Sequence, residues 1–285
     1  MLIDRVGKLP VLERFLYWIR ERHAIYLRRE TGKPKPWTDD KVLQQYFFTN
    51  PYREHDKTTV WFRKHVREPL RNDPRVLMAT VIFRWFNYIP TGEVLLHHRL
   101  LTDWRLAVAK NRLRRLGKVF TGAFNISNSG STKPKIDRVC DDYIQPIWQD
   151  RKRLLQRIQQ CGTMQATHTA LRCYMGMGGS GFMTYEVVCD LRHTYLLRSA
   201  VDKCTWSNPG PGAKRGLNRL LSRHLKEPVR DWLDQSGRLL STMQDRLDEM
   251  PVFEMREVEH SLCEFDKYER ARLGDGHVKR RYTGC

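Results

Sequence analysis

The chain has 285 residues, with 51 Lys and Arg against 32 Asp and Glu, which gives a formal net charge of +19. This length is enough for a sizeable hydrophobic core and predicts one unit over residues 1–285, made of two closely packed lobes. Positive charge along the whole chain favours a polyanionic partner such as nucleic acid, and it argues against a membrane-surface protein because no basic amphipathic helix stands apart.

The cysteines and the N-terminal residues exclude further classes of protein. Seven cysteines are widely spaced and form no CxxC pair, which argues against a disulfide framework, a zinc knuckle and an iron–sulfur cluster. The N-terminal residues mix Arg and Glu with apolar residues and lack the uninterrupted apolar stretch of a signal peptide or membrane span. We therefore expect reduced thiols, no membrane association and a cytoplasmic location.

Helical periodicity dominates the first part of the chain. Apolar residues at helical spacing predict helices over residues 8–30, 58–67, 74–86 and 91–116. The third of these contains β-branched residues, but it is longer than a typical strand, so a helix is favoured. Asp39 or Asp40 is placed to cap a further helix that follows them. We expect one lobe to consist of residues 1–118 together with the C-terminal helices.

The second part of the chain is also helical, with one insertion. Residues 120–135 are rich in Ser, Gly, Asn and Thr and predict a loop or a short hairpin. Helices are predicted over residues 136–160, 164–174, 182–190, 217–225, 229–247 and 252–265. Residues 136–225 are expected to form the second lobe, and the fold class predicted for the chain is all-α.

A glycine-rich turn between two of these helices is the most informative local pattern. Gly176, Met177 and Gly178 form a Gly-apolar-Gly turn, and the next helix begins near Gly181 and Phe182. Glycine permits the sharp turn, and the N–H groups of the following helix can bind a DNA phosphate without reading sequence. The alternatives are a turn without a ligand and a mononucleotide phosphate loop. A P-loop kinase is excluded because no GxxxxGK[ST] motif occurs.

Motifs along most of the chain carry a resemblance to a known family. They are KPKPWTDD, TNPYREHDKTT, VIFRWFN, GMGGSGFMTYEVVCDLRHT, DKCTWSNPGPGAKRGLNRL and EHSLCEFDKYER. The glycine segment resembles the helix-hairpin-helix DNA glycosylase superfamily. The chain as a whole resembles the phage alpha-glutamyl/putrescinyl thymine pyrophosphorylases, which are amino acid:DNA transferases related to the helical domain of 5-hydroxymethyldeoxyuridine DNA kinase.

The resemblance implies a fold, a reaction and partners. The fold is an all-α, helix-hairpin-helix glycosylase-like structure of two helical lobes with a cleft between them. The reaction replaces pyrophosphate on 5-(pyrophosphoryloxymethyl)deoxyuridine in DNA with an amine, which is an amino acid or a polyamine. The implied partners are modified phage DNA, the amine co-substrate and the 5-hydroxymethyluracil DNA kinase of the same pathway, and Mg²⁺ could accompany the pyrophosphate.

Asp202 is the predicted catalytic residue. It follows Gly176 by 26 residues, about where the resemblance implies the catalytic Asp of helix-hairpin-helix glycosylases. Such a carboxylate stabilises positive charge at the sugar of a glycosylase, whereas in a transferase it could orient and deprotonate the incoming amine. The alternative is a structural Asp that caps a helix or pairs with Lys203 or Arg198.

Other residues are predicted to bind the substrate. A departing pyrophosphate needs cations and hydrogen-bond donors, and the candidates are Arg53, Arg84, Asn87, Arg192, His193, Lys214 and Arg215. An extruded base needs stacking and edge hydrogen bonds, for which Tyr52, Trp206 and Asn50 are predicted. The hairpin glycines predicted to bind DNA phosphate are Gly176, Gly178, Gly179 and Gly181. Each Arg could instead be ion-paired and each aromatic residue part of the core, and no dense carboxylate motif demands a metal.

Glu259, His260, Glu264 and Lys267 form a polar set on the last predicted helix, which could close the cleft or be a charged surface. Three functions therefore stay open at this point. The first is the transferase, the second is a DNA glycosylase that removes a modified pyrimidine, and the third is a non-catalytic, DNA-binding helical partner of the kinase.

Overall fold

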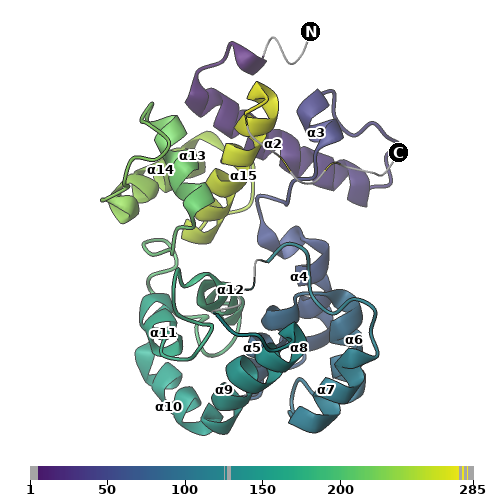
Figure 1. Ribbon diagram of the computed structural model, residues 1–285. Coiled ribbons are helices and arrows are strands. Elements are labelled where there is room, and N and C mark those ends of the chain that lie inside the picture. The colour runs from purple at the N-terminus through teal and green to yellow at the C-terminus, as the bar shows by residue number, and fades with distance from the viewer. Residues whose placement is uncertain (1–5, 125, 127–129, 276–277, 279–280, 282–285) are drawn as a thin grey trace. The chain divides into compact units, whose positions relative to one another are not determined.

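The computed structural model describes residues 6–124, 126, 130–275, 278 and 281, and over these residues the fold is all-helical, as predicted (Figure 1). The α-helices are α2 (Val11–Glu30), α3 (Lys41–Gln45), α4 (Lys57–Phe62), α5 (Val76–Phe86), α6 (Ile89–His97), α7 (Leu106–Arg114), α8 (Lys135–Asp137), α9 (Gln145–Gln149), α10 (Arg151–Cys161), α11 (Met164–Leu171), α12 (Phe182–Leu191), α13 (Pro211–Leu220), α14 (Trp232–Arg246) and α15 (Met255–Leu273). Short η1 (Arg53–His55) is a 3₁₀ helix, and η2 (Arg63–Arg67) and η3 (Arg138–Ile144) are π-helical.

The chain divides into two compact units. Met1–Asp56 and Cys204–Cys285 form the first, which we call the terminal unit, and Lys57–Lys203 form the second, the central unit. This division differs from the predicted lobes, because α5 lies against α12 and α13 lies against α15. The stretch 57–118 therefore belongs with the glycine turn, and residues 204–225 belong with the chain ends.

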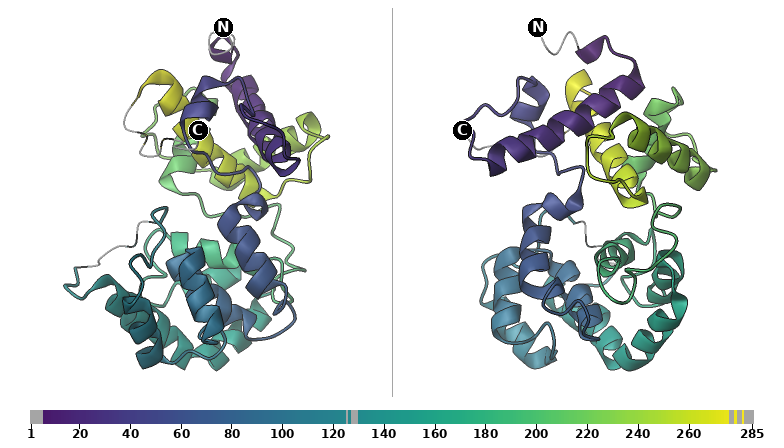
Figure 2. Two further views of the ribbon diagram at one scale, coloured as in Figure 1. Left: turned by 90° about the vertical axis from the view of Figure 1, so that its right-hand side faces the viewer. Right: turned by 180° about the vertical axis from the view of Figure 1, so that it is seen from behind.

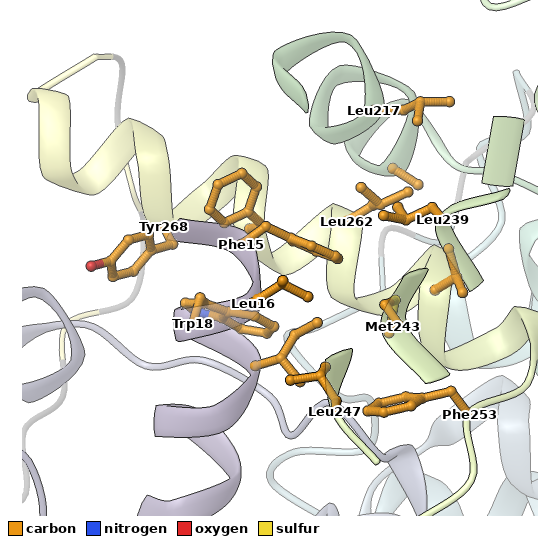
Figure 3. Close-up of a cluster of buried hydrophobic side chains, with 14 of the residues drawn as sticks. Phe15, Leu16, Trp18, Leu217, Leu239, Met243, Leu247, Phe253, Leu262 and Tyr268 are labelled. Atoms are coloured by element: carbon orange, nitrogen blue, oxygen red, sulfur yellow. The ribbon is translucent and has the colours of Figure 1, made fainter. Parts of the chain in front are cut away.

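Helices that are far apart in the sequence share the core of the terminal unit. Apolar side chains of α2, α13, α14 and α15 meet in the cluster drawn in Figure 3, and the further views show α15 beside α13 (Figure 2). Phe15 of α2 makes an edge-to-face contact with Phe265 of α15, with ring centroids 5.3 Å apart. Arg14 pairs with buried Glu269 at 2.9 Å, so the polar edge of this core is neutralised. The prediction of α2 from its apolar periodicity is confirmed.

A glycine allows α13 to approach α15 closely. A Cβ atom built on Gly216 would lie 2.1 Å from the carbonyl oxygen of Leu262, so any side chain forces the two helices apart. We expect Gly216→Ala to lower the free energy of unfolding by about 3 kcal/mol, because the obstacle is backbone and cannot rotate away. Gly237 of α14 has open space around its Cβ position, and Gly237→Ala should stabilise the protein by about 0.5–1 kcal/mol. Urea unfolding of both variants tests the contrast, and equal effects would contradict it.

The central unit is built around α5 and α12. All eleven residues of α5 are buried, which confirms that this stretch is a helix, and Phe62 stacks on Phe83 with ring centroids 4.7 Å apart. The single helix predicted over 91–116 is wrong: α6 ends at His97 and α7 begins at Leu106. Arg99 adopts a left-handed φ of 57° there, and the turn buries Leu100 and Trp104. The short hairpin predicted at 120–135 falls partly on residues outside those described, and the described ones form turns and bends.

Candidate functional site

A helix, a glycine turn and a second helix occur where the sequence predicts them, as α11, residues 172–181 and α12. Gly176 and Gly181 have φ of +79° and +72°, a region that residues with a side chain seldom adopt. A Cβ on Gly176 would lie 2.7 Å from the ring of Trp85, so the turn passes directly over an aromatic surface. The N-cap residue of α12 is Gly181, which has no side chain to cap the helix. Its first N–H groups therefore keep the capacity to bind an anion.

A hollow of about 570 Å³ adjoins this turn. Its wall contains Trp85 and Tyr143, which stack with ring centroids 4.6 Å apart. Phe182 and Met175 flank the turn and are 41% and 62% exposed, which is unusual for side chains of this size. An exposed apolar side chain beside a phosphate-binding turn is typical of surfaces that contact unstacked bases.

Positive charge is concentrated in the central unit. It contains 25 Lys and Arg against 11 Asp and Glu, a net charge of +14, whereas the terminal unit, with 26 against 21, has +5. Helix α10, which lies against α11, begins with Arg151, Lys152 and Arg153. Most of the positive charge that favours a polyanionic partner therefore lies in the unit that carries the glycine turn.

Asp202 caps a helix in the central unit. Its two carboxylate oxygens accept hydrogen bonds from the backbone N–H groups of Met164 and Gln165, at 2.8 and 2.9 Å, and the residue is 9% exposed. These donors lie at the N-terminus of α11, whereas the glycine turn follows its C-terminus. Of the two predicted roles the structure displays the capping one, and the catalytic role stays a prediction.

Two substitutions of Asp202 separate these roles. Asn caps helices about as well as Asp, so Asp202→Asn should change the free energy of unfolding by less than about 0.5 kcal/mol, whereas Asp202→Ala should cost about 1–2 kcal/mol. Thermal unfolding checks both values. If Asp202 is also catalytic, the Asn variant loses turnover while it keeps its stability; full turnover in that variant would limit Asp202 to capping.

The predicted cations of the central unit are largely internal. Arg84 is fully buried, and its guanidinium binds both carboxylate oxygens of Asp190 and donates to Asn87 Oδ1 at 2.7 Å. Arg84 and Asn87 therefore hold α5 to α12, and their contact with pyrophosphate stays a prediction. Arg192 is also buried, and its Nε lies 3.1 Å from Nε2 of half-buried His193.

Three separated segments converge on a polar site in the terminal unit. The Thr49 N–H donates to Glu264 at 3.0 Å, and Thr49 Oγ1 lies 2.9 Å from His260 Nε2. The Gly210 N–H donates to Glu259 at 3.3 Å, which brings the Pro/Gly segment before α13 to the same helix. Residues of two motifs, TNPYREHD and SNPGPG, thus contact the motif EHSLCEFDK of α15, although the three are far apart in the sequence. We call this arrangement the α15 polar site.

His260 is the central titratable group of the α15 polar site. Burial lowers its pKa well below 6.5, and the positive charges of Arg256 and Arg53 lower it further. The backbone of Asn50 acts in the opposite direction and raises the pKa. A neutral ring has one N–H and one acceptor nitrogen, so in the tautomer protonated at Nδ1 the Nε2 atom accepts the hydroxyl proton of Thr49. The pair is therefore arranged as a hydroxyl beside a neutral base.

Asn50 and Arg53, both predicted from the sequence, belong to this neighbourhood. The Asn50 side chain donates to Asp56 Oδ1 at 2.9 Å, and burial raises the pKa of Asp56, opposed by these hydrogen bonds and by Arg53. Asn50 and Arg53 are 4% and 8% exposed, so they shape the site from below its surface. Thr49 and His260 are the half-buried members, and neither was predicted to bind substrate.

The remaining predicted residues of the terminal unit are dispersed. Tyr52 is buried, donates to Pro251 O and stacks on Phe253, so it packs in the core, and its stacking on a base stays a prediction. Trp206 is 7% exposed. Lys214 is exposed, but Arg215 pairs with Asp266 at 2.9 Å, so the two do not form one anion clamp.

Two features of the described residues concern metal binding and membranes. No group of three or more His, Cys, Asp or Glu side chains in that part of the chain is placed to hold a metal ion. No helix formed by those residues has the length and apolar character needed to cross a bilayer. Six of the seven cysteines lie in the described part, and all six are free thiols.

Together these features define a protein that is all-helical over its described residues, with one strongly basic unit and a second unit that carries a polar site. The chain belongs to the family described as the helical domain of 5-hmdU (5-hydroxymethyldeoxyuridine) DNA kinase, whose model matches residues 9–277. A 5-hmdU DNA kinase of Bacillus phage SP10 is 28% identical over 228 residues, which are 71% of this chain and 35% of that protein. The chain therefore spans about a third of this relative. No solved structure matches it significantly.

Proposed function

We propose that the chain acts in the hypermodification of thymine in phage DNA, as a transferase that replaces pyrophosphate on 5-(pyrophosphoryloxymethyl)deoxyuridine with an amine. The observation that carries the proposal is that Thr49 and His260, from segments far apart in the sequence, lie side by side, since a hydroxyl held beside a neutral imidazole is a proton-accepting pair. Membership of the kinase-associated family supports the substrate, because 5-hmdU is the nucleoside that precedes the pyrophosphorylated base.

The proposed step forms one bond and breaks one. The amine nitrogen attacks the exocyclic methylene, the carbon–oxygen bond breaks, and pyrophosphate leaves with the electron pair. The proton lost by the amine passes to Thr49 Oγ1 while the Thr49 hydroxyl proton passes to His260 Nε2. Cationic side chains near this pair, among them Arg53 and Lys267, favour the departing anion, which Mg²⁺ could accompany. Amino acids and polyamines are both proposed as amine donors.

The central unit is proposed to hold the DNA. The +14 charge, the N-terminus of α12 and the exposed Phe182 beside the glycine turn support sequence-independent binding of the phosphate backbone. These same observations favour a second function, a DNA-binding helical partner of a 5-hmdU kinase domain. The glycosylase rests on Asp202 alone, and both oxygens of that carboxylate are engaged by α11.

One incubation separates the three functions. DNA that contains 5-(pyrophosphoryloxymethyl)deoxyuridine is mixed with the protein and with glutamate, glycine or putrescine, then digested to nucleosides for mass spectrometry. The transferase yields an amine-substituted nucleoside and free pyrophosphate. Abasic sites would identify the glycosylase. Unchanged nucleosides with every amine, from protein that binds the DNA, would favour the helical partner and reject the transferase.

A further inference from the structure

The terminal unit contains a second hollow that the proposed function does not use. It has a volume of about 290 Å³ and lies between one face of α2 and residues 35–48. Its floor is apolar, since Leu43 and Phe48 are buried at 8% and 3% exposure. Half-buried Trp37 and Phe47, which is 41% exposed, stand at its edge. The volume is at the lower end of the range for small-molecule sites.

The charge around this hollow has one sign. Arg22, Arg29 and Lys35 line it, and none of the described residues that line it is acidic. A neighbouring hollow of about 280 Å³ shares Trp37 with the first and is lined by Arg28 as well as by Glu21 and Asp39. The charged side chains in the described lining of the first hollow are therefore all cations, and we call this hollow the cationic pocket.

The three cations differ in how they are held. Arg22 Nε donates to the Phe48 carbonyl at 3.1 Å, which fixes its position at the floor. The Lys35 ammonium lies 5.3 Å from the centre of the Trp37 ring and is exposed. Arg29 lies 3.7 Å from Glu30, but both side chains are about half exposed, and such surface pairs contribute little energy. Arg29 can therefore reorient toward a bound anion at small cost, whereas Arg22 presents its charge from a fixed position.

We propose that the cationic pocket binds a single nucleotide, with the base against the apolar floor and aromatic edge and the phosphate among the cations. Aromatic rings stack on Trp and Phe with an energy of about 1–3 kcal/mol per base, and arginines prefer phosphate oxygens. A free phosphate would leave the apolar floor unused, and a polyamine would be repelled. The site does not depend on the transferase, because it needs neither Thr49 nor His260. The nucleotide is either free or an unpaired nucleotide of a DNA strand.

Calorimetric titration of the full chain tests the proposal. The probes are thymidine 5′-monophosphate, thymidine, and a short 5′-phosphorylated single-stranded thymidine oligomer. We expect saturable binding of the monophosphate or the oligomer, and binding of thymidine at least about tenfold weaker, because thymidine lacks the anion. Saturation by the monophosphate indicates a free nucleotide and supports the site. Saturation by the oligomer alone indicates a DNA strand, and it supports the site only where Lys35→Glu weakens it, because the central unit is also proposed to bind the phosphate backbone. Saturation by neither overturns it.

A matched pair of charge reversals assigns the binding to the cationic pocket. Lys35→Glu changes a lining residue, and Lys33→Glu makes the same change two residues away, at an exposed position outside the lining. We expect Lys35→Glu to weaken binding by about tenfold and Lys33→Glu by less than about twofold. Phe47→Ala should weaken binding to a similar extent as Lys35→Glu, and circular dichroism verifies folding. Equal affinities of the Lys35→Glu and Lys33→Glu proteins would place the nucleotide elsewhere and overturn the proposal.

Discussion

Asp190→Ala is expected to destabilise the protein by about 3–5 kcal/mol, because it leaves buried positive charge without its counterion. Asp190 is 1% exposed and binds Arg84, and Arg67 Nη1 lies 3.6 Å from its Oδ1. Both arginines are at most 1% exposed, so water cannot replace the carboxylate. The loss is a large fraction of the stability of a typical domain. Urea unfolding followed by circular dichroism measures it.

A surface pair provides the control for this prediction. Asp234 and Arg238 of α14 lie 3.1 Å apart, but their side chains are 58% and 80% exposed. Asp234→Ala should therefore cost less than about 0.5 kcal/mol. The double variant Asp190→Leu, Arg84→Met should recover part of the loss, because it removes the arginine that binds both carboxylate oxygens of Asp190. A cost below about 1 kcal/mol for Asp190→Ala would show that the buried network contributes little.

Local signals in the sequence predict much of the fold. The apolar periodicity of α2 and α5 identifies both helices, and Asp40 caps α3 as expected, accepting from the Val42 N–H at 2.8 Å. The glycine turn is also predictable from the sequence, because backbone conformations with positive φ are usually occupied by glycine. These features depend on residues close in the sequence, so they need no knowledge of the tertiary contacts.

Features that depend on distant contacts were not predictable in the same way. The polar appearance of Arg84 suggests a surface cation, but Asp190, 106 residues away, makes it an internal one. The pairing of Thr49 with His260 joins residues 211 positions apart, and the only signal was that each lies in a distinctive motif. Burial is likewise invisible for Tyr52, whose aromatic ring suits a base pocket as well as a core.

His260→Gln is expected to lower the rate of amine-substituted nucleoside formation by about 10²–10⁴-fold, because the proposed proton acceptor is removed. Glutamine can still hydrogen-bond Thr49 and the Asn50 backbone, so the fold should persist. Burial lowers the pKa of His260, so the imidazole is neutral at pH 7 and the wild-type rate should fall only well below pH 6.5. The free energy of unfolding changes with pH in the same direction as the rate. The unfolded chain, in which the pKa of His260 is not lowered, binds the proton more readily, so the folded protein loses stability as pH falls below 6.5.

The matched control is another histidine of the same unit. His224 is exposed at the end of α13, and His224→Gln should keep the wild-type rate and pH profile. Thr49→Val removes the hydroxyl but leaves the imidazole. If protons pass through Thr49, the rate of this variant should fall about as far as that of His260→Gln. If the amine reaches His260 directly, the rate should fall much less. Equal rates for folded His260→Gln and His224→Gln proteins would remove His260 from the chemistry. The converging segments would then be structural, and the DNA-binding helical partner would become the better account of the chain.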